Sequence, residues 1–210
     1  MIAIVDYGVG NLFSLKSSFA AIGAEAAVTA DAEDLKRAER VVLPGVGAFG
    51  DAADKLRASG LLEAVLREAR AGKPMLGICL GMQLLFERSF EYGEHAGLGL
   101  IPGSVKPIEP LLDGRLKVPH MGWNRLDYPA GRPRSPLFKY LEGDAYVYFV
   151  HSFAAMDCDA DVIATAEYGF DVTAAVQRGN VFGTQFHPEK SGPVGLNILR
   201  AFVEWKGADA

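Results

Sequence analysis

The sequence predicts a single mixed α/β domain, with a mainly parallel central sheet, flanking helices and an added antiparallel portion. Half of the 210 residues are hydrophobic and 22% are charged, enough apolar side chain for one substantial core. The first half alternates short apolar runs with amphipathic segments, which is typical of a parallel sheet covered by helices. The second half carries closely spaced strand-like runs with few helices between them, which indicates antiparallel pairs. We therefore expect one domain over residues 1–210.

Each expected element follows from its hydrophobic period. Short apolar runs predict buried strands in the first half, and Leu12, Leu15, Phe19 and Ile22 stand at helical spacing. The expected strands of the first half are residues 2–5, 41–43 and 75–78, and the expected helices are residues 12–22, 51–70 and 80–87. The expected strands of the second half are residues 105–108, 145–150, 162–166, 172–176 and 181–186, before a last amphipathic helix near residues 196–203.

Composition excludes several classes of protein. The net charge of −5 leaves no basic surface, so nucleic acid is not an expected partner. No apolar run approaches the roughly 20 residues that cross a bilayer, and the first residues lack the pattern of a secretion signal, so we expect a cytoplasmic protein without membrane contact. Cys79 and Cys158 are expected to be free thiols. Without a Cys-x-x-Cys pair, and with scattered histidines, the sequence predicts neither a metal site nor a cofactor.

The strongest local motif is Gly77-Ile78-Cys79-Leu80-Gly81, between an expected strand and an expected helix. It matches the Gly-x-nucleophile-x-Gly elbow, in which a sharp turn strains the nucleophile and leaves no room for side chains two residues away. The first helical amides point toward the sulfur and favour its thiolate, and the Leu80 N–H is placed to donate to an oxyanion. A cysteine packed as a small hydrophobic residue is the alternative.

A second motif, His187-Pro188-Glu189, follows the apolar run 181–186. A cysteine that attacks an amide needs a base that later returns a proton to the leaving group, and a carboxylate orients such a histidine. Residues two apart in an extended segment point the same way, so Glu189 can face His187. Taken alone, the motif also fits a surface histidine before a turn. Together with the elbow, it predicts a Cys79–His187–Glu189 triad at the carboxyl ends of the strands.

These motifs resemble those of the class I, triad-type glutamine amidotransferases, and within them the glutaminase subunits of imidazole glycerol phosphate synthases. The resemblance covers nearly the whole chain, including the fold. Its motifs, in chain order, are Asp6-Tyr7-Gly8-Val9-Gly10-Asn11, Pro44-Gly45-Val46-Gly47-Ala48-Phe49, Gly77-Ile78-Cys79-Leu80-Gly81-Met82-Gln83, Pro119-His120-Met121-Gly122-Trp123-Asn124 and His187-Pro188-Glu189-Lys190-Ser191. Phe153 stands where the family has Tyr, and Phe13 where it often has a charged residue.

The resemblance implies further site residues. Val46 would supply the second oxyanion N–H, beside Leu80. The substrate glutamine would be held by Gly47, Gln83 and the backbone of Ser152 and Phe153. The positions that would face a partner are Asn11, His120, Trp123 and Lys190.

The implied function is hydrolysis of glutamine to glutamate and ammonia through a cysteinyl thioester. The ammonia would pass to a cyclase subunit with a β/α-barrel fold, the other half of a heterodimer, which makes imidazole glycerol phosphate and aminoimidazole carboxamide ribotide in histidine biosynthesis. Three alternatives stay open at this point: a glutaminase subunit of another synthase, such as pyridoxal phosphate synthase, a cysteine peptidase or α/β-hydrolase relative, and a catalytically silent module that only binds a partner.

Overall fold

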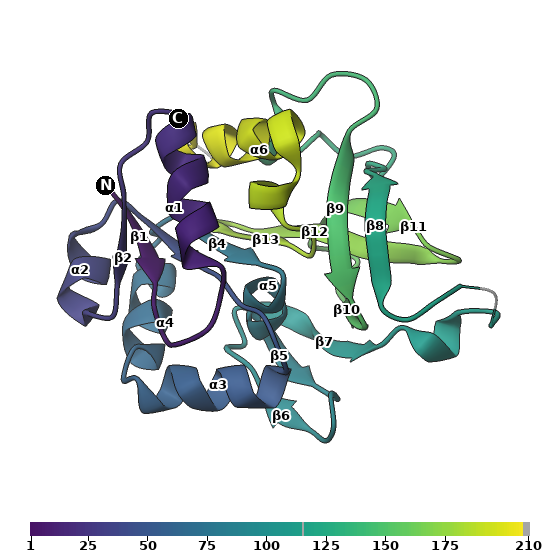
Figure 1. Ribbon diagram of the computed structural model, residues 1–210, viewed down its shortest axis with the longest axis horizontal. Helices are drawn as coiled ribbons and strands as arrows, with labels where there is room; N and C mark the ends of the chain where they lie inside the picture. The colour runs from purple at the N-terminus through teal and green to yellow at the C-terminus, as the bar shows by residue number, and fades with distance from the viewer. Residues whose placement is uncertain (115, 208–210) are drawn as a thin grey trace.

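A seven-stranded sheet runs through both halves of the chain, in the order β11-β12-β13-β4-β3-β1-β2 (Figure 1). The computed structural model describes residues 1–114 and 116–207. Strands β1 to β4 and β13 are parallel, whereas β11 and β12 extend the sheet by antiparallel pairing. The predicted fold class is confirmed. The strands are β1 (Ile2–Val5), β2 (Ala26–Thr29), β3 (Arg40–Leu43), β4 (Met75–Ile78), β11 (Val162–Glu167), β12 (Asp171–Arg178) and β13 (Val181–Thr184).

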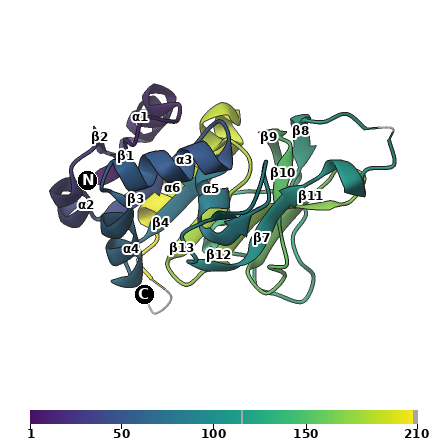
Figure 2. The same cartoon turned by 90° about the horizontal axis from the view of Figure 1, so that it is seen from below.

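Helices cover both faces of the parallel strands, and alternate side chains of each strand enter different cores. In β1, Ala3 and Val5 pack toward the layer of α2, α3 and α4, whereas Ile2 and Ile4 pack toward α1 and α6. Figure 2 shows α1, α2 and α4 at one end of the molecule and β8 to β11 at the other. The helices are α1 (Leu12–Ala21), α2 (Ala32–Arg37), α3 (Phe49–Ala58), α4 (Leu62–Arg70), α5 (Leu80–Leu84) and α6 (Gly192–Glu204).

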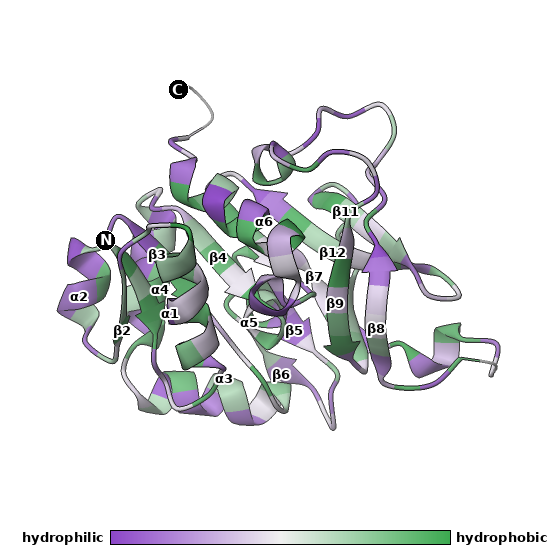
Figure 3. Cartoon of the chain, turned by 45° about the horizontal axis from the view of Figure 1, so that its top comes forward, coloured by the Kyte–Doolittle hydropathy of each residue, from purple (hydrophilic) through white to green (hydrophobic). Residues whose placement is uncertain are grey.

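Two smaller sheets lie beside the main one. A four-stranded sheet has the order β10-β7-β5-β6, and β8 pairs with β9 in an antiparallel ribbon. Hydrophobic residues run along β9, while much of β8 and α2 is hydrophilic (Figure 3). No helix among the described residues is long and apolar enough to span a bilayer. The remaining elements are β5 (Phe86–Ser89), β6 (His95–Ala96), β7 (Ile101–Pro107), β8 (His120–Arg125), β9 (Tyr146–His151), β10 (Phe153–Met156) and the 3₁₀ turns Glu109–Leu111, Pro136–Phe138 and Pro188–Lys190.

The structure corrects several expected elements. The single helix expected over residues 51–70 is two helices, α3 and α4, because Gly60 takes a left-handed conformation with φ of 75° and ends the first. The helix expected over residues 80–87 stops at Leu84, and the chain enters β5 instead. Strand β2, helix α2 and strands β5, β6, β8 and β10 were not predicted.

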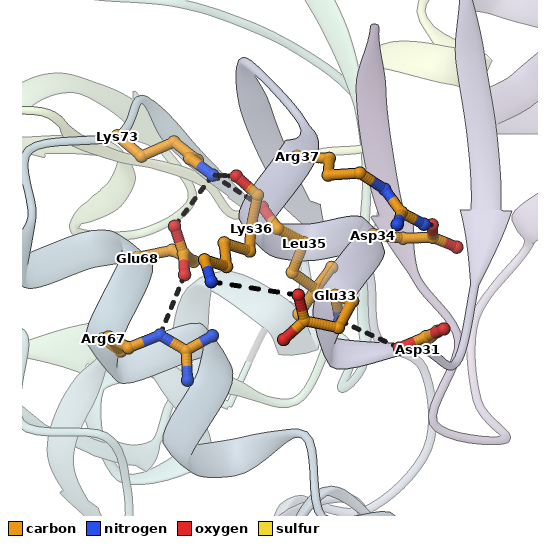
Figure 4. A network of polar contacts seen from close by, with 9 residues as sticks. All are labelled: Asp31, Glu33, Asp34, Leu35, Lys36, Arg37, Arg67, Glu68 and Lys73. Carbon is orange, nitrogen blue, oxygen red and sulfur yellow. Dashed lines mark hydrogen bonds and ion pairs between the residues drawn. The ribbon is translucent and has the colours of Figure 1, made fainter.

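A charged network joins α2 to the end of α4 (Figure 4). Glu68, largely buried, pairs with Lys73 at 2.8 Å and Arg67 at 3.0 Å. The Lys73 ammonium also donates to the carbonyl oxygens of Leu35 and Lys36, at 2.6 and 2.8 Å, which satisfies acceptors at the α2 C-terminus. Burial raises the pKa of Glu68, but its hydrogen bonds with Lys73 and Arg67 outweigh burial and lower it overall.

Candidate active site

The turn between β4 and α5 strains the predicted nucleophile. Cys79 has φ of 54° and ψ of −113°, a region that non-glycine residues rarely occupy. Its N–H donates to Thr184 O at 2.7 Å, so β13 holds the turn. A Cβ on Gly81 would lie 1.9 Å from Leu43 O, and one on Gly77 would lie 2.7 Å from Gly81 O. Both glycines are therefore required by close backbone approach, as the elbow motif predicts.

Strand pairing brings the second motif to the same place. Because β13 lies parallel to β4, with Thr184 opposite Ile78, the residues that follow both strands leave the sheet at one edge. The Ser191 hydroxyl fixes the segment after β13, since it donates to His187 O at 2.7 Å and accepts from Tyr148 N at 3.0 Å. The His187 N–H also donates to Tyr148 O at 2.9 Å, so contacts to β9 hold the backbone segment that carries the imidazole.

The structure brings Cys79, His187 and Glu189 together. His187 Nδ1 lies 2.8 Å from Glu189 Oε1, with both side chains almost fully buried, and His187 lines the same cavity as Cys79. Burial lowers the pKa of His187, but the hydrogen bonds with Cys79 and Glu189 outweigh it and raise the pKa from 6.5 to about 9. The imidazole therefore holds a proton at neutral pH, as a general acid for a leaving amine requires.

A cavity of about 350 Å³ opens onto the thiol. It contains the predicted oxyanion residues Val46 and Leu80, and Gly47 and Gln83 line it too, so the positions assigned to glutamine share one site with the nucleophile. Glu189 stands behind His187 rather than in the wall. The lining residues are Val46, Gly47, Cys79, Leu80, Gln83, Glu91, Pro119, Val150, His151, Ser152, Phe153, His187 and Lys190.

The loop that carries Val46 is anchored only at its ends. The Tyr7 hydroxyl donates to Pro44 O at 2.7 Å, and Phe49 N donates to the Glu91 carboxylate at 2.6 Å. Gly47 takes φ of 94°, and the Val46 N–H has no acceptor within residues 1–114 and 116–207. Leu80, in the first turn of α5, likewise has an N–H that the helix leaves free. Two backbone donors are thus available near the sulfur.

Gln83 links the cavity to β10, the strand that follows β9. Its Nε2 donates to Phe153 O and to Gln185 Oε1, each at 3.0 Å. His151 Nδ1 also contacts Phe153 O, at 2.9 Å. The Phe153 carbonyl is consequently occupied by two donors of the chain itself, and the Ser152 carbonyl accepts from Ile108 N at 3.1 Å.

These features match one family throughout the chain. The model of the family described as "Glutamine amidotransferase class-I" matches residues 3–205. The chain belongs to the class I glutamine amidotransferases. Subunit HisH of imidazole glycerol phosphate synthase from Wolinella succinogenes is 49% identical over 206 residues, covering 97% of this chain and 99% of that protein. The subunit of the same name from Syntrophotalea carbinolica is 52% identical, covering 96% and 98%.

The fold of this amidotransferase is also found in solved structures. A crystal structure described as that of a glutamine amidotransferase superposes with a TM-score of 0.74 at 21% identity, covering 97% of this chain and 98% of the other. At that identity the match shows the fold, which agrees with the strand order described above.

One predicted partner position of the amidotransferase is wrong for its side chain. His120 is fully buried, stacked between Phe149 and Tyr168 with ring centroids 4.7 and 4.0 Å away. Its nitrogens contact Asn124 Oδ1 at 2.8 Å and His151 Nε2 at 2.9 Å, and burial lowers its pKa. The side chain cannot reach a partner because β8 turns it inward, toward β9 and the cavity wall.

The other partner positions stay predictions. Trp123 is 53% exposed and packs edge-on against Tyr148, whose ring also lies 5.9 Å from the Lys190 ammonium. Asn11 caps α1 by accepting from Ser14 N. The exposed neighbours Phe13 and Met121 add apolar surface.

Sequence reasoning missed two residues of the site, Glu91 and Gln185. Glu91 brings a carboxylate into the cavity wall from the loop between β5 and β6, two elements that the sequence did not predict. Gln185 donates from Nε2 to Cys79 Sγ at 3.8 Å. Its place two residues before His187 was an available signal, since residues two apart in an extended segment share a face. In the part of the chain that the structure describes, no cluster of His, Cys, Asp and Glu is arranged for a metal ion, and Cys79 and Cys158 are free thiols.

Proposed function

We propose that this chain is the glutaminase subunit of an imidazole glycerol phosphate synthase. The observation that carries the proposal is the strained Cys79, which shares a cavity of about 350 Å³ with a His187 that is paired with buried Glu189. The names of relatives about 50% identical support the choice of synthase. Residues 1–210 would act as one amidotransferase domain, because the main sheet joins strands of both halves.

In the proposed reaction, the Cys79 thiolate attacks the side-chain amide carbon of glutamine. His187 gives its proton to the departing nitrogen, and ammonia leaves a glutamyl thioester. His187 then takes a proton from water, which attacks the thioester and releases glutamate and the thiolate. Glu189 keeps the imidazole oriented and stabilises its cation.

The backbone and two polar side chains would hold the reacting groups. The N–H groups of Leu80 and Val46 donate to the oxyanion of each tetrahedral intermediate, and removal of one such donor costs about 10²–10³-fold in rate. At the amino-acid end, the Glu91 carboxylate offers a counterion to the α-ammonium. Gly47 and the backbone of Ser152 and Phe153 complete this end of the site, beside Gln83.

The ammonia would pass to a cyclase subunit with a β/α-barrel fold, the partner in a heterodimer. Direct transfer matters because free ammonia becomes ammonium in neutral water and loses its nucleophilic lone pair. Trp123, Lys190 and Asn11 are the proposed contact positions. The Val46 loop, free of hydrogen bonds between its anchors, gives the partner a donor to reorient. We place the assembly in the cytoplasm.

The test measures glutamine hydrolysis and synthesis by the chain, alone and combined with the cyclase subunit that we propose as its partner. We expect weak glutamine hydrolysis by the chain alone and strong stimulation by the cyclase with its ligand. Cys79→Ala should abolish glutamine-dependent synthesis and spare synthesis from ammonium salts, while Cys158→Ala should spare both. Full turnover without a partner, or stimulation only by a pyridoxal phosphate synthase subunit, would overturn the proposal. Survival of both activities in Cys79→Ala would show that Cys79 is not the nucleophile.

A further inference from the structure

We infer that Gln185 is a positioning residue that donates a hydrogen bond to the Cys79 sulfur and stabilises its thiolate, an inference that rests on the proposed glutaminase function. Gln185 follows β13 directly, where Cys79 follows β4. Its side chain is fully buried, and its Nε2 lies 3.8 Å from Cys79 Sγ, within the range of N–H···S hydrogen bonds.

The orientation of the Gln185 amide follows from a backbone carbonyl. A glutamine amide can be turned end for end without changing its shape. Phe153 O only accepts, so the end of Gln83 that contacts it must be the Nε2 amino group. The same amino group meets Gln185 at 3.0 Å, so the Gln185 atom there must be its carbonyl oxygen. The Gln185 amino group is then left facing the sulfur.

A buried N–H group in this place favours the anionic form of the sulfur. A neutral thiol is a weak acceptor, whereas a thiolate accepts strongly, and hydrogen bonds to the charged form of a group favour that form. Helix α5 has only five residues, so its dipole alone offers little compensation. Gln185 adds a fixed donor from the opposite strand.

These contacts also couple the Gln185 amino group to substrate binding. Gln83 lines the cavity and holds Gln185 by its carbonyl oxygen. A ligand that moves Gln83 therefore moves the hydrogen-bond donor of the nucleophile, with no change in His187. Gln185 thus links the site for glutamine to the reactivity of the sulfur.

Alkylation by iodoacetamide tests this link, because it needs neither partner nor glutamine turnover. The rate at Cys79 is followed against pH by mass spectrometry in the wild type and in Gln185→Met, which removes the donor at similar size. We expect the midpoint of the pH profile to rise by about one unit. In the complex with the cyclase subunit, kcat with glutamine should fall about 10- to 100-fold, with KM changed by less than about threefold.

Two further variants keep the test decisive. Gln185→Glu retains the acceptor for Gln83 and places a negative charge near the sulfur, so its midpoint should rise further. Gln177→Met removes an amide at the opposite end of the β12–β13 pair and should leave the wild-type profile. A wild-type profile in both Gln185 variants would overturn the inference. If the wild-type complex fails to hydrolyse glutamine while the profile still shifts, the proposed function fails and the role of Gln185 stands.

Discussion

Two polar networks in this molecule use different chemistry. At the cavity, amides and imidazoles are joined through backbone carbonyls, as in the contacts of Gln83, Gln185 and His151. Between α2 and α4, the charged groups of Glu68, Lys73 and Arg67 meet near the surface. A network of neutral groups fixes which atom donates to which, whereas ion pairs at a surface tolerate many geometries. The first network therefore fixes reactive geometry, and the second contributes stability.

Substitution of Gly81 should have the largest effect on the first network. In Gly81→Ala, the new methyl group would meet Leu43 O at 1.9 Å, so β3 and the elbow must move apart. A displacement of about 1 Å at a nucleophile lowers the rate on the order of 10²-fold, and overpacking costs about 1–3 kcal/mol of stability. Glutaminase assays of the complex and denaturant unfolding measure the two losses.

Gly60→Ala is the matched control for that variant. It makes the same chemical change in open space, at the break between α3 and α4. We expect a loss of about 1 kcal/mol, from its positive φ alone, and unchanged glutamine turnover. Equal glutaminase activity in Gly81→Ala and Gly60→Ala would show that crowding at the elbow does not control catalysis.

The second prediction concerns the carboxylate of the triad. Glu189→Gln keeps the shape of the side chain and removes the charge that supports protonated His187, so kcat should fall about 10²-fold or more. Glu63→Gln, on the exposed face of α4, should leave kcat unchanged. A Glu189→Gln enzyme with wild-type turnover would exclude Glu189 from catalysis.

The stability difference between the wild type and Glu189→Gln should vary with pH. A group whose pKa is raised on folding stabilises the folded state most below its unfolded pKa, near 6.5 for histidine. That stabilisation is lost as pH rises through the folded pKa of His187, about 9. The difference in unfolding free energy between wild type and Glu189→Gln should therefore be largest at acidic to neutral pH and shrink above pH 9, as followed by urea unfolding.

The smallest effects belong to the charged network. Lys73→Met removes the partner of Glu68 and the donor to the α2 C-terminus, and should cost roughly 1–2 kcal/mol of stability, with glutaminase activity unchanged. Because the pKa of Glu68 is lowered in the folded protein, this difference should be present near neutral pH and shrink as pH falls below 4.5. Lys36→Met, at the exposed end of the network, should change stability by less than about 0.5 kcal/mol. Loss of glutamine turnover in Lys73→Met would show that the charged network also supports catalysis.

The elements that the sequence predicted well are those with a strong local signal. Strands β1 and β4 are buried on both faces and read as continuous apolar runs, and the glycine pair of the elbow is explained by the crowding at Gly77 and Gly81. The meeting of Cys79 with His187 required a nonlocal pairing, β4 with β13. The sequence placed both motifs at the carboxyl ends of expected strands, and the pairing of β4 with β13 brings them to one edge of the sheet.

The elements that were not predicted have weak or conflicting sequence patterns. The edge strand β2 is mostly half-buried and its alanines favour no period, while Ser59-Gly60 is a stop signal inside a region that is otherwise helical in pattern. The burial of His120 depends on the register of β8 on β9, which a single sequence does not contain. For the same reason the orientation of Gln185 became visible only with the contacts of Gln83 and Phe153 in place.

The order of the strands has a consequence for synthesis of the chain. Cys79 leaves the ribosome early. Gln185 follows 106 positions later, and the general base His187 comes after it. Until β13 docks on β4, the nascent polypeptide carries a thiol without its proton acceptor, and long-range pairings of this kind form slowly. Unfinished chains therefore lack the pairing of Cys79 with His187.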